Sequence, residues 1–172
     1  MRAKRLAPRL TRSFPDPDPI RSLLSSVSSL RVVVLGVGDS LRGDDGAGPL
    51  LISKLRGRTG ALLLEGGNMP ENQTRPVMDA RPDVLLIVDA AEWGGAPGAL
   101  SVVDEGQIGN ETIGTHGMSL ALMLRYLKTG TRARVYLIGI QPKHKVFMRR
   151  MSAEVRRSVE RLAGLLQEAI PG

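Results

Sequence analysis

Short runs of β-branched and aliphatic residues recur along this 172-residue chain and alternate with segments of helical periodicity. The first run, Val32-Val33-Val34-Leu35, has no polar position, which is typical of a strand buried on both faces of a parallel sheet. Similar runs predict strands at residues 32–35, 61–64, 84–88, 99–103 and 134–140.

Between several of these runs, apolar residues recur three and four positions apart, as they do on one face of a helix. This spacing predicts helices at residues 49–55, 119–127 and 152–170. The alternation predicts an α/β domain of three layers, a mainly parallel central sheet of about five strands with helices on both faces. Four methionines are expected to fill its core: Met118, Met123, Met148 and Met151.

Residues 1–30 differ from the remainder, because scattered arginines, prolines and serines leave no sustained periodicity. We expect a loosely ordered basic extension there, followed by a single α/β domain over residues 31–172. Serines interrupt its apolar residues, so it lacks the continuous apolar core of a secretory signal, and we expect a cytoplasmic protein. No run approaches the roughly 18 uncharged apolar residues of a membrane helix, which excludes membrane insertion.

The composition narrows the chemistry that the chain can support. Because it has no cysteine, it can form no disulfide, thiolate metal site or cysteine nucleophile, and any metal must be held by oxygen or imidazole. The formal charge of +7 suggests nucleic acid, but six basic and two acidic residues within 1–30 account for +4 of it. Only five aromatic residues are present in the whole chain. We therefore expect no nucleic-acid partner, and we expect a monomer.

A glycine-rich segment follows the first strand, where ligand loops open in α/β sheets. A dinucleotide fingerprint needs a third glycine at position 41, which is Leu41. A phosphate loop needs Lys-Ser/Thr after Gly43, but Asp44 and Asp45 stand there and would repel phosphate. Adjacent carboxylates suit a cation, or water activated beside one; the alternative is that one caps the next helix and the other is solvated.

Two further side chains are predicted near the same edge of the sheet. Asp89 ends the third strand, and His116 precedes the helix at 119–127. Taken singly, each has a structural explanation, as a turn, a cap or a loop histidine. Together with an acid of the first loop they form a ligand set suited to nickel, zinc, manganese or iron. Lys143 and Lys145 flank His144 and would oppose metal binding, so His144 is assigned to the surface; Glu65 is predicted toward the ligand edge, with a structural turn role as the alternative.

Several segments, in order, resemble one known family over residues 31–165. They are Gly36-Val37-Gly38-Asp39 with Asp44-Asp45-Gly46-Ala47-Gly48-Pro49-Leu50-Leu51, Glu65-Gly66-Gly67 with Pro70-Glu71-Asn72, Leu85-Leu86-Ile87-Val88-Asp89-Ala90, Thr115-His116, and Gly139-Ile140-Gln141-Pro142. The chain resembles the maturation endopeptidases of [NiFe] hydrogenases. The Pro-Glu-Asn and Gly-Ile-Gln-Pro segments are most similar to the branch that serves hydrogenase 3 of formate hydrogenlyase.

The resemblance implies a specific activity. Such peptidases remove a C-terminal extension from the hydrogenase large-subunit precursor after metal insertion, and nickel carried by the precursor is the recognition signal. The metal-contacting positions of the family fall on Asp45, Asp89 and His116, with Asp45 and Asp89 as candidate catalytic acids. Two positions depart from the family pattern: Asp39 replaces a common Asn, and Glu65 replaces an Asp.

The sequence does not choose between two mechanisms, and it leaves two alternative functions open. The metal can polarise the scissile carbonyl or lower the pKa of a bound water, with Asp45 or Asp89 as base. One alternative is a hydrolase that holds its own zinc or manganese and cleaves small peptides. The other is a non-catalytic checkpoint protein that binds nickel-loaded subunits without cutting them.

Overall fold

A twisted five-stranded sheet forms the centre of the molecule in the computed structural model, which describes residues 18–104 and 117–172. The strands are β1 (Val32–Val37), β2 (Leu62–Gly67), β3 (Val84–Ala90), β4 (Leu100–Asp104) and β5 (Arg134–Ile140). Their order is β2-β1-β3-β5-β4; β1 pairs in parallel with β2 and β3, β3 pairs in parallel with β5, and β4 is antiparallel to β5. The prediction of a mainly parallel five-stranded sheet is confirmed.

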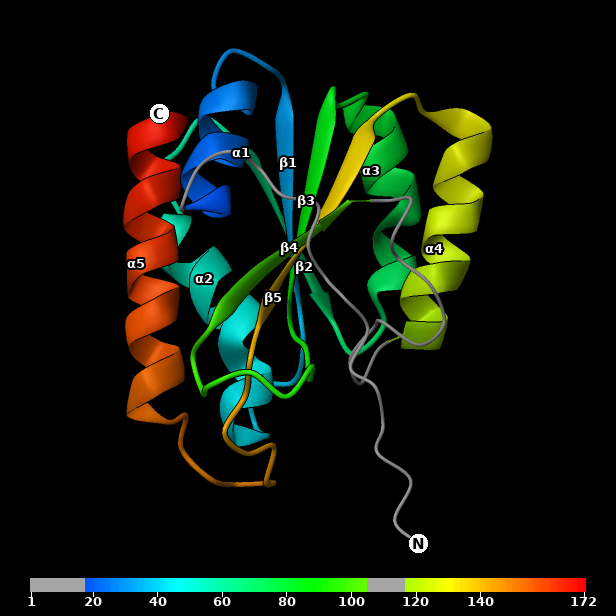
Figure 1. Cartoon of the computed structure of the whole chain (residues 1–172). Helices are drawn as coiled ribbons and strands as arrows, with labels where there is room; N and C mark the ends of the chain where they lie inside the picture. Colours follow the sequence, from blue (N-terminus) through cyan, green and yellow to red (C-terminus); the bar gives the residue numbers. More distant parts are fainter. Residues whose placement is uncertain (1–17, 105–116) are drawn as a thin grey trace, which may run out of the picture.

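Helices cover both faces of this sheet (Figure 1). They are α1 (Pro19–Val27), α2 (Ala47–Leu55), α3 (Thr74–Ala80), α4 (Gly117–Gly130) and α5 (Ala153–Ala169), with short 3-10 turns η1 (Gly43–Gly46) and η2 (Pro70–Gln73). α1, α2 and α5 lie on one face, and α3 and α4 lie on the other. The three-layer prediction is confirmed, as are the three predicted helices; α3 was not predicted.

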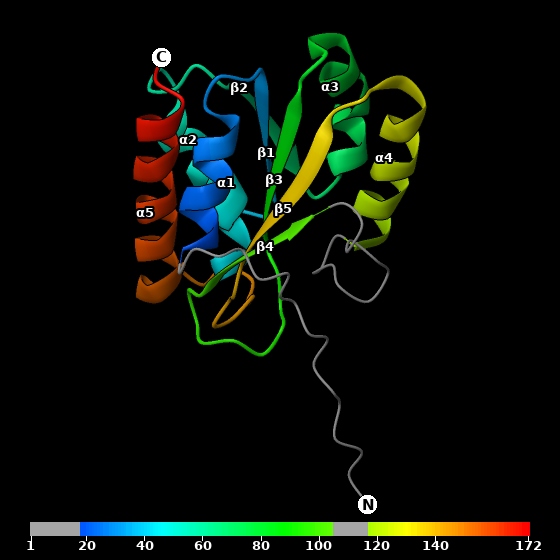
Figure 2. The same ribbon diagram turned by 45° about the horizontal axis from the view of Figure 1, so that its top comes forward.

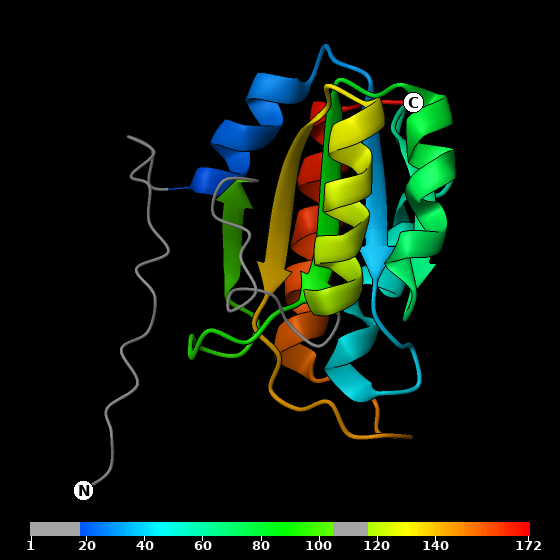
Figure 3. The ribbon, with the colours of Figure 1, turned by 90° about the vertical axis from the view of Figure 1, so that its right-hand side faces the viewer.

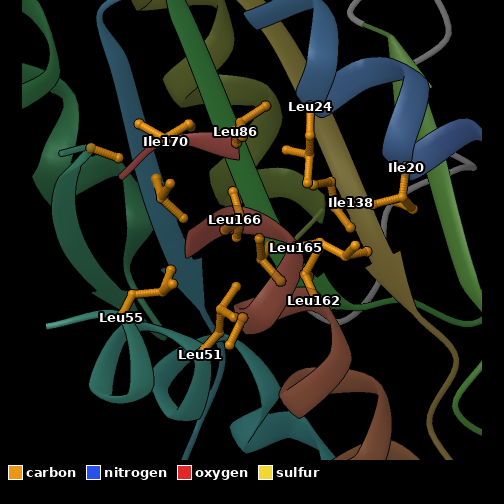
Figure 4. Packing of buried hydrophobic residues seen from close by; sticks show 14 of the residues in the cluster. Ile20, Leu24, Leu51, Leu55, Leu86, Ile138, Leu162, Leu165, Leu166 and Ile170 are labelled. Atoms are coloured by element: carbon orange, nitrogen blue, oxygen red, sulfur yellow. The ribbon is translucent and has the colours of Figure 1, made fainter. Parts of the chain in front are cut away.

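Alternate residues of the central strands enter two separate cores, as the two-residue period of a strand requires. Leu86 of β3 packs with Leu51 of α2 and Leu162 of α5 on one face (Figure 4). Its neighbour Ile87 packs on the other face, in a cluster that includes Met123 of α4. Every residue of β1 and β3 is buried, which explains their uninterrupted apolar sequences.

The expectation of a loosely ordered extension over 1–30 is wrong for Pro19–Val27, which form α1 beside α5 (Figure 2). Asp18 caps this helix by accepting a hydrogen bond from the backbone N–H of Arg21, and Pro19 suits its first turn. Its buried stripe is Ile20, Leu23, Leu24 and Val27. The interspersed serines that disguised the pattern in the sequence form the polar face of an amphipathic helix. Residues 1–17 lie outside the described part.

The carboxyl ends of the parallel strands meet at one edge, the lower edge in Figure 3, where the arrowheads of β1 and β5 point down and that of β4 points up. The connections that follow β1, β3 and β5 therefore gather at this edge, which we call the carboxyl edge. Across residues 18–104 and 117–172, none of the helices has the length and apolar character needed to cross a membrane.

The packing of α1 can be tested with Leu24→Ala. Leu24 is 2% exposed, and truncation of such a side chain leaves a cavity, so the free energy of unfolding should fall by about 2–5 kcal/mol in urea titrations. The control Ser25→Ala, on the exposed face of the same helix, should change it by less than about 0.5 kcal/mol. Equal stabilities for the two variants would show that α1 does not contribute to the core.

Candidate functional site

The glycines of the first loop bring η1 and α2 against the ends of the central strands. A Cβ atom on Gly38, whose φ is +127°, would lie 1.9 Å from the carbonyl oxygen of Asp45. A Cβ atom on Gly48 would lie 2.3 Å from the carbonyl oxygen of Val37 in β1 and 2.7 Å from that of Val88 in β3. These glycines serve close backbone packing rather than phosphate binding, and they seat the acid pair across the carboxyl ends of β1 and β3.

Asp44 is a completely buried carboxylate that joins two distant segments. Its Oδ2 accepts hydrogen bonds from the backbone N–H groups of Lys143 (2.8 Å) and His144 (3.1 Å) and from Ser152 Oγ (2.9 Å). Its Oδ1 accepts from the backbone N–H of Ser152 at 2.6 Å. Burial by itself raises the pKa of Asp44, but the bonds from Ser152, Lys143 and His144 outweigh it and hold the pKa below the ordinary 3.8. Both oxygens are thus engaged in binding the β5–α5 connection to the first loop.

Asp45 turns its carboxylate back toward β1 instead. The side chain is 2% exposed, and its Oδ2 accepts a hydrogen bond from the backbone N–H of Asp39 at 2.9 Å. Asp39 itself accepts from the backbone N–H of Leu41 at 2.8 Å, a bond that shapes the turn. The two adjacent acids therefore have different surroundings, because Asp44 bonds to the β5–α5 connection whereas Asp45 bonds to Asp39 of its own loop.

Asp89 lies at the carboxyl end of β3, is completely buried, and belongs to a strand that contacts η1. The structure thus places Asp45 and Asp89 on adjoining elements of the same edge; their roles as ligands or bases stay predictions. The third predicted ligand, His116, lies outside the described residues. Within residues 18–104 and 117–172, no three acidic or histidine side chains gather into a metal-binding group.

Glu65 and His144, for which the sequence also offered structural roles, have structural contacts. Glu65, on edge strand β2, has a half-exposed side chain that forms an ion pair with Arg56. His144 is half-buried rather than fully at the surface, and its ring packs against Gly43, where a Cβ atom would lie 2.8 Å from Nδ1. Neither contact adds these side chains to the pair formed by Asp45 and Asp89.

Lys145 is a component of the edge that sequence reasoning missed. Its side chain is only 10% exposed, and its ammonium donates a hydrogen bond to the carbonyl oxygen of Ala90 at 2.9 Å and pairs with Glu92 at 3.4 Å. Ala90 directly follows Asp89, so a buried cation lies at the end of the strand that carries a buried acid. Charge of opposite sign lowers the free-energy penalty for burying a carboxylate. The β3–β5 pairing would have located Lys145, because it places Ala90 opposite Ile140, the residue at which β5 ends.

Gln141 holds the next connection at the same edge. Its side-chain oxygen accepts hydrogen bonds from the backbone N–H groups of Trp93 (3.0 Å) and Gly95 (3.2 Å), and its own carbonyl accepts from Gly98 at 2.8 Å. The segment between β3 and β4 is therefore tied to the end of β5. This gives the Gly-Ile-Gln-Pro segment a structural role beside the candidate site.

The role of Asp44 can be tested by the pH dependence of stability. A carboxylate with a lowered pKa in the folded state stabilises the fold above its ordinary pKa, and this stabilisation is lost as the pH falls through the ordinary value toward the folded one. Asp44→Asn, which turns an amide toward four donors, should lower the free energy of unfolding by about 2–3 kcal/mol at pH 7. The difference from the unsubstituted protein should shrink below about pH 4.

Urea titrations between pH 3 and pH 8 measure this effect, with Asp79→Asn on α3 as control. Asp79 is an exposed acid paired with Arg75, so its substitution should change stability by less than about 1 kcal/mol. A pH-independent difference for Asp44→Asn would contradict the assignment of an ionised, stabilising carboxylate.

Comparison with known proteins finds relatives in both sequence and fold. The sequence pattern of the HycI family, hydrogenase maturation protease, matches residues 51–169. The hydrogenase 3 maturation protease of Escherichia coli K12 is 37% identical over 131 residues, which cover 74% of this chain and 83% of that protein. The crystal structure of a [NiFe] hydrogenase maturation protease HycI from Thermococcus kodakarensis superposes with a TM-score of 0.78 at 32% identity, covering 86% of this chain and 97% of that one.

The solution structure of the endopeptidase HycI from Escherichia coli superposes with a TM-score of 0.72 at 36% identity, covering 80% of this chain and 90% of that one. Both the sequence and the fold therefore match over most of their length. The chain is a peptidase and belongs to the hydrogenase maturation protease family.

Proposed function

We propose that this protein is the endopeptidase that removes the C-terminal extension of a [NiFe] hydrogenase large-subunit precursor, and that nickel carried by the precursor is its recognition signal. The observation that supports this proposal is the placement of two buried acids, Asp45 and Asp89, on adjoining elements at one edge of a hydrogenase maturation protease fold. The similarity to the hydrogenase 3 protease favours a precursor of that type. Location in the cytoplasm stays a prediction of the sequence.

Nickel enters this proposal as part of the substrate. Carboxylate oxygen and imidazole nitrogen are suitable ligands for divalent nickel, so Asp45, Asp89 and His116 are the proposed contacts. Asp44 is not available for this role, because both of its oxygens bind the β5–α5 connection. The hydrogen bonds of Asp44 give it a structural role and thus support Asp45 as the proposed metal contact of the acid pair.

Cleavage is hydrolysis of one peptide bond near the metal. A water oxygen attacks the scissile carbonyl carbon, its proton passes to Asp45 or Asp89, and the carbon–nitrogen bond breaks as the leaving nitrogen takes up a proton. Contact between the metal and the acids would fix the scissile bond at the carboxyl edge, and this positioning contributes to the rate. The resident-metal hydrolase and the non-catalytic checkpoint protein differ from this proposal in their products.

Intact-mass measurement of the large-subunit precursor, with and without inserted nickel, tests the proposal. The unsubstituted protein should shorten only the nickel-loaded precursor. Asp45→Asn, Asp89→Asn and His116→Ala should each slow shortening by about 10²-fold or more, because each removes a contact or the base. Asp79→Asn serves as the control acid and should process at the unsubstituted rate.

The outcomes separate the alternatives. Cleavage of short peptides by protein purified with its own metal would favour the resident-metal hydrolase. Nickel-dependent association without a change in precursor mass would favour the checkpoint protein. Full activity in both Asp45→Asn and His116→Ala would contradict the assigned metal contacts.

The buried cation provides a second prediction for the same activity. Lys145→Met removes the ammonium that lies at Ala90 and should slow processing by about 10-fold, because neighbouring groups that orient a metal-contacting residue commonly have effects of this size. Lys143→Met, which removes an exposed cation two residues away, should have little effect. Initial rates of precursor shortening measure this difference, and unaltered rates for Lys145→Met would show that the ammonium serves stability alone.

A further inference from the structure

An apolar surface is exposed at the carboxyl edge, beside the candidate site. It consists of four side chains with large exposed fractions: Leu41 (55%), Val146 (49%), Phe147 (60%) and Met148 (74%). Met148 was expected in the core, and its exposure is the largest of the four. Contiguous exposed apolar side chains of this kind often mark sites of interaction.

The backbone at Met148 has an unusual conformation and is held in place by hydrogen bonds. Its φ is +59°, a left-handed conformation that residues other than glycine seldom adopt. Its N–H donates a hydrogen bond to the carbonyl oxygen of Leu41 at 2.7 Å, and the Asp44 hydrogen bonds hold the segment on both sides. A strained residue that is held in place and presents an apolar side chain to water indicates a functional requirement.

A groove with a volume of about 640 Å³ opens next to this residue. Leu41, Leu50 and Met148 supply apolar wall, while Arg149, Arg150 and Arg156 supply positive charge. Gly43 and Gly46, which flank Asp44 and Asp45, also line the groove, so it adjoins the loop that carries the proposed metal contact. None of the described residues that line it is acidic.

Some exposed arginines of the chain are neutralised by carboxylates of the chain, whereas those of the groove are not, within the described residues. Arg31, Arg56 and Arg75 each pair with a carboxylate of their own chain. Arg149, Arg150 and Arg156 form no ion pair within residues 18–104 and 117–172. Three guanidinium groups around an apolar wall are complementary to carboxylates around an apolar side chain.

We propose that this groove is the docking surface for the folded precursor, and that it receives a segment of the precursor that carries carboxylate side chains next to an apolar side chain. The inference rests on the proposed function, because the groove adjoins the loop of Asp45. Docking at this surface would position the metal-bearing part of the precursor over the carboxyl edge. The groove then determines affinity for the protein substrate, separately from the contacts to nickel.

The double variant Arg149→Glu with Arg150→Glu tests this inference with nickel-loaded precursor as substrate. KM should rise by about 10- to 100-fold while kcat stays within about twofold, because the variant alters charges of the docking surface and leaves the acids intact. The matched control is Arg58→Glu with Arg132→Glu, two exposed arginines before β2 and β5 at the opposite edge of the sheet. The control has the same change in net charge and should keep both constants within about twofold.

Met148→Gly is a second variant that separates docking from folding. Glycine adopts the left-handed conformation without strain, so the melting temperature should stay level or rise, whereas KM should rise because the apolar contact is lost. A lower melting temperature with unchanged KM would overturn the inference. Raising salt should increase KM of the unsubstituted protein more steeply than KM of the double variant.

The two proposals fail in different ways. Cleavage of nickel-loaded precursor by the unsubstituted protein, with equal KM for the double variant and the control, would overturn the docking surface and leave the proposed function intact. A reduced kcat with unchanged KM would likewise overturn it. Absence of both cleavage and binding by the unsubstituted protein would overturn both proposals.

Discussion

The buried carboxylate of Asp44 is the constraint on which the carboxyl edge depends. Its hydrogen bonds to Lys143, His144 and Ser152 cross about a hundred positions of sequence and join the turn after β1 to the connection after β5. The same connection brings Lys145 to the end of β3 and presents Met148 to solvent. The position of the neighbouring acid, the buried cation and the exposed apolar side chains thus all depend on one carboxylate.

The acid pair shows how neighbours in sequence acquire different roles. Burying an ionised carboxylate is unfavourable unless hydrogen bonds or opposite charges compensate it. Backbone N–H groups and a hydroxyl supply that compensation for Asp44, which stays ionised inside the fold. Asp45 is held by the turn of Asp39, and Asp89 lies next to the residue bound by the Lys145 ammonium. Asp44 is therefore held by a distant connection of the chain, and Asp45 by its own loop.

Local patterns in the sequence were enough to predict the sheet, because β1 and β3 are buried on both faces and their residues leave no doubt about strand character. The helix α1 was missed, since prolines and serines obscured an apolar stripe that makes sense only when α5 lies beside it. The contacts of Asp44 and Lys145 depend on strand order and register, which composition and spacing do not encode. Asp45 and Asp89 were assigned to one edge from strand ends and resemblance, while His116 lies outside the described residues.

The packing of α1 against α5 joins the first and last helices of the described fold. Together with the bond from Ser152 to Asp44, 108 positions apart, it makes assembly of the carboxyl edge a late event in synthesis. A nascent chain emerging from the ribosome exposes Asp45 and Asp89 long before α5 exists to complete their surroundings. The bond to Asp44 can form only after Ser152 has been synthesised, and contacts between residues so far apart in sequence also form slowly. The order of synthesis itself therefore keeps an unfinished chain from completing its carboxyl edge.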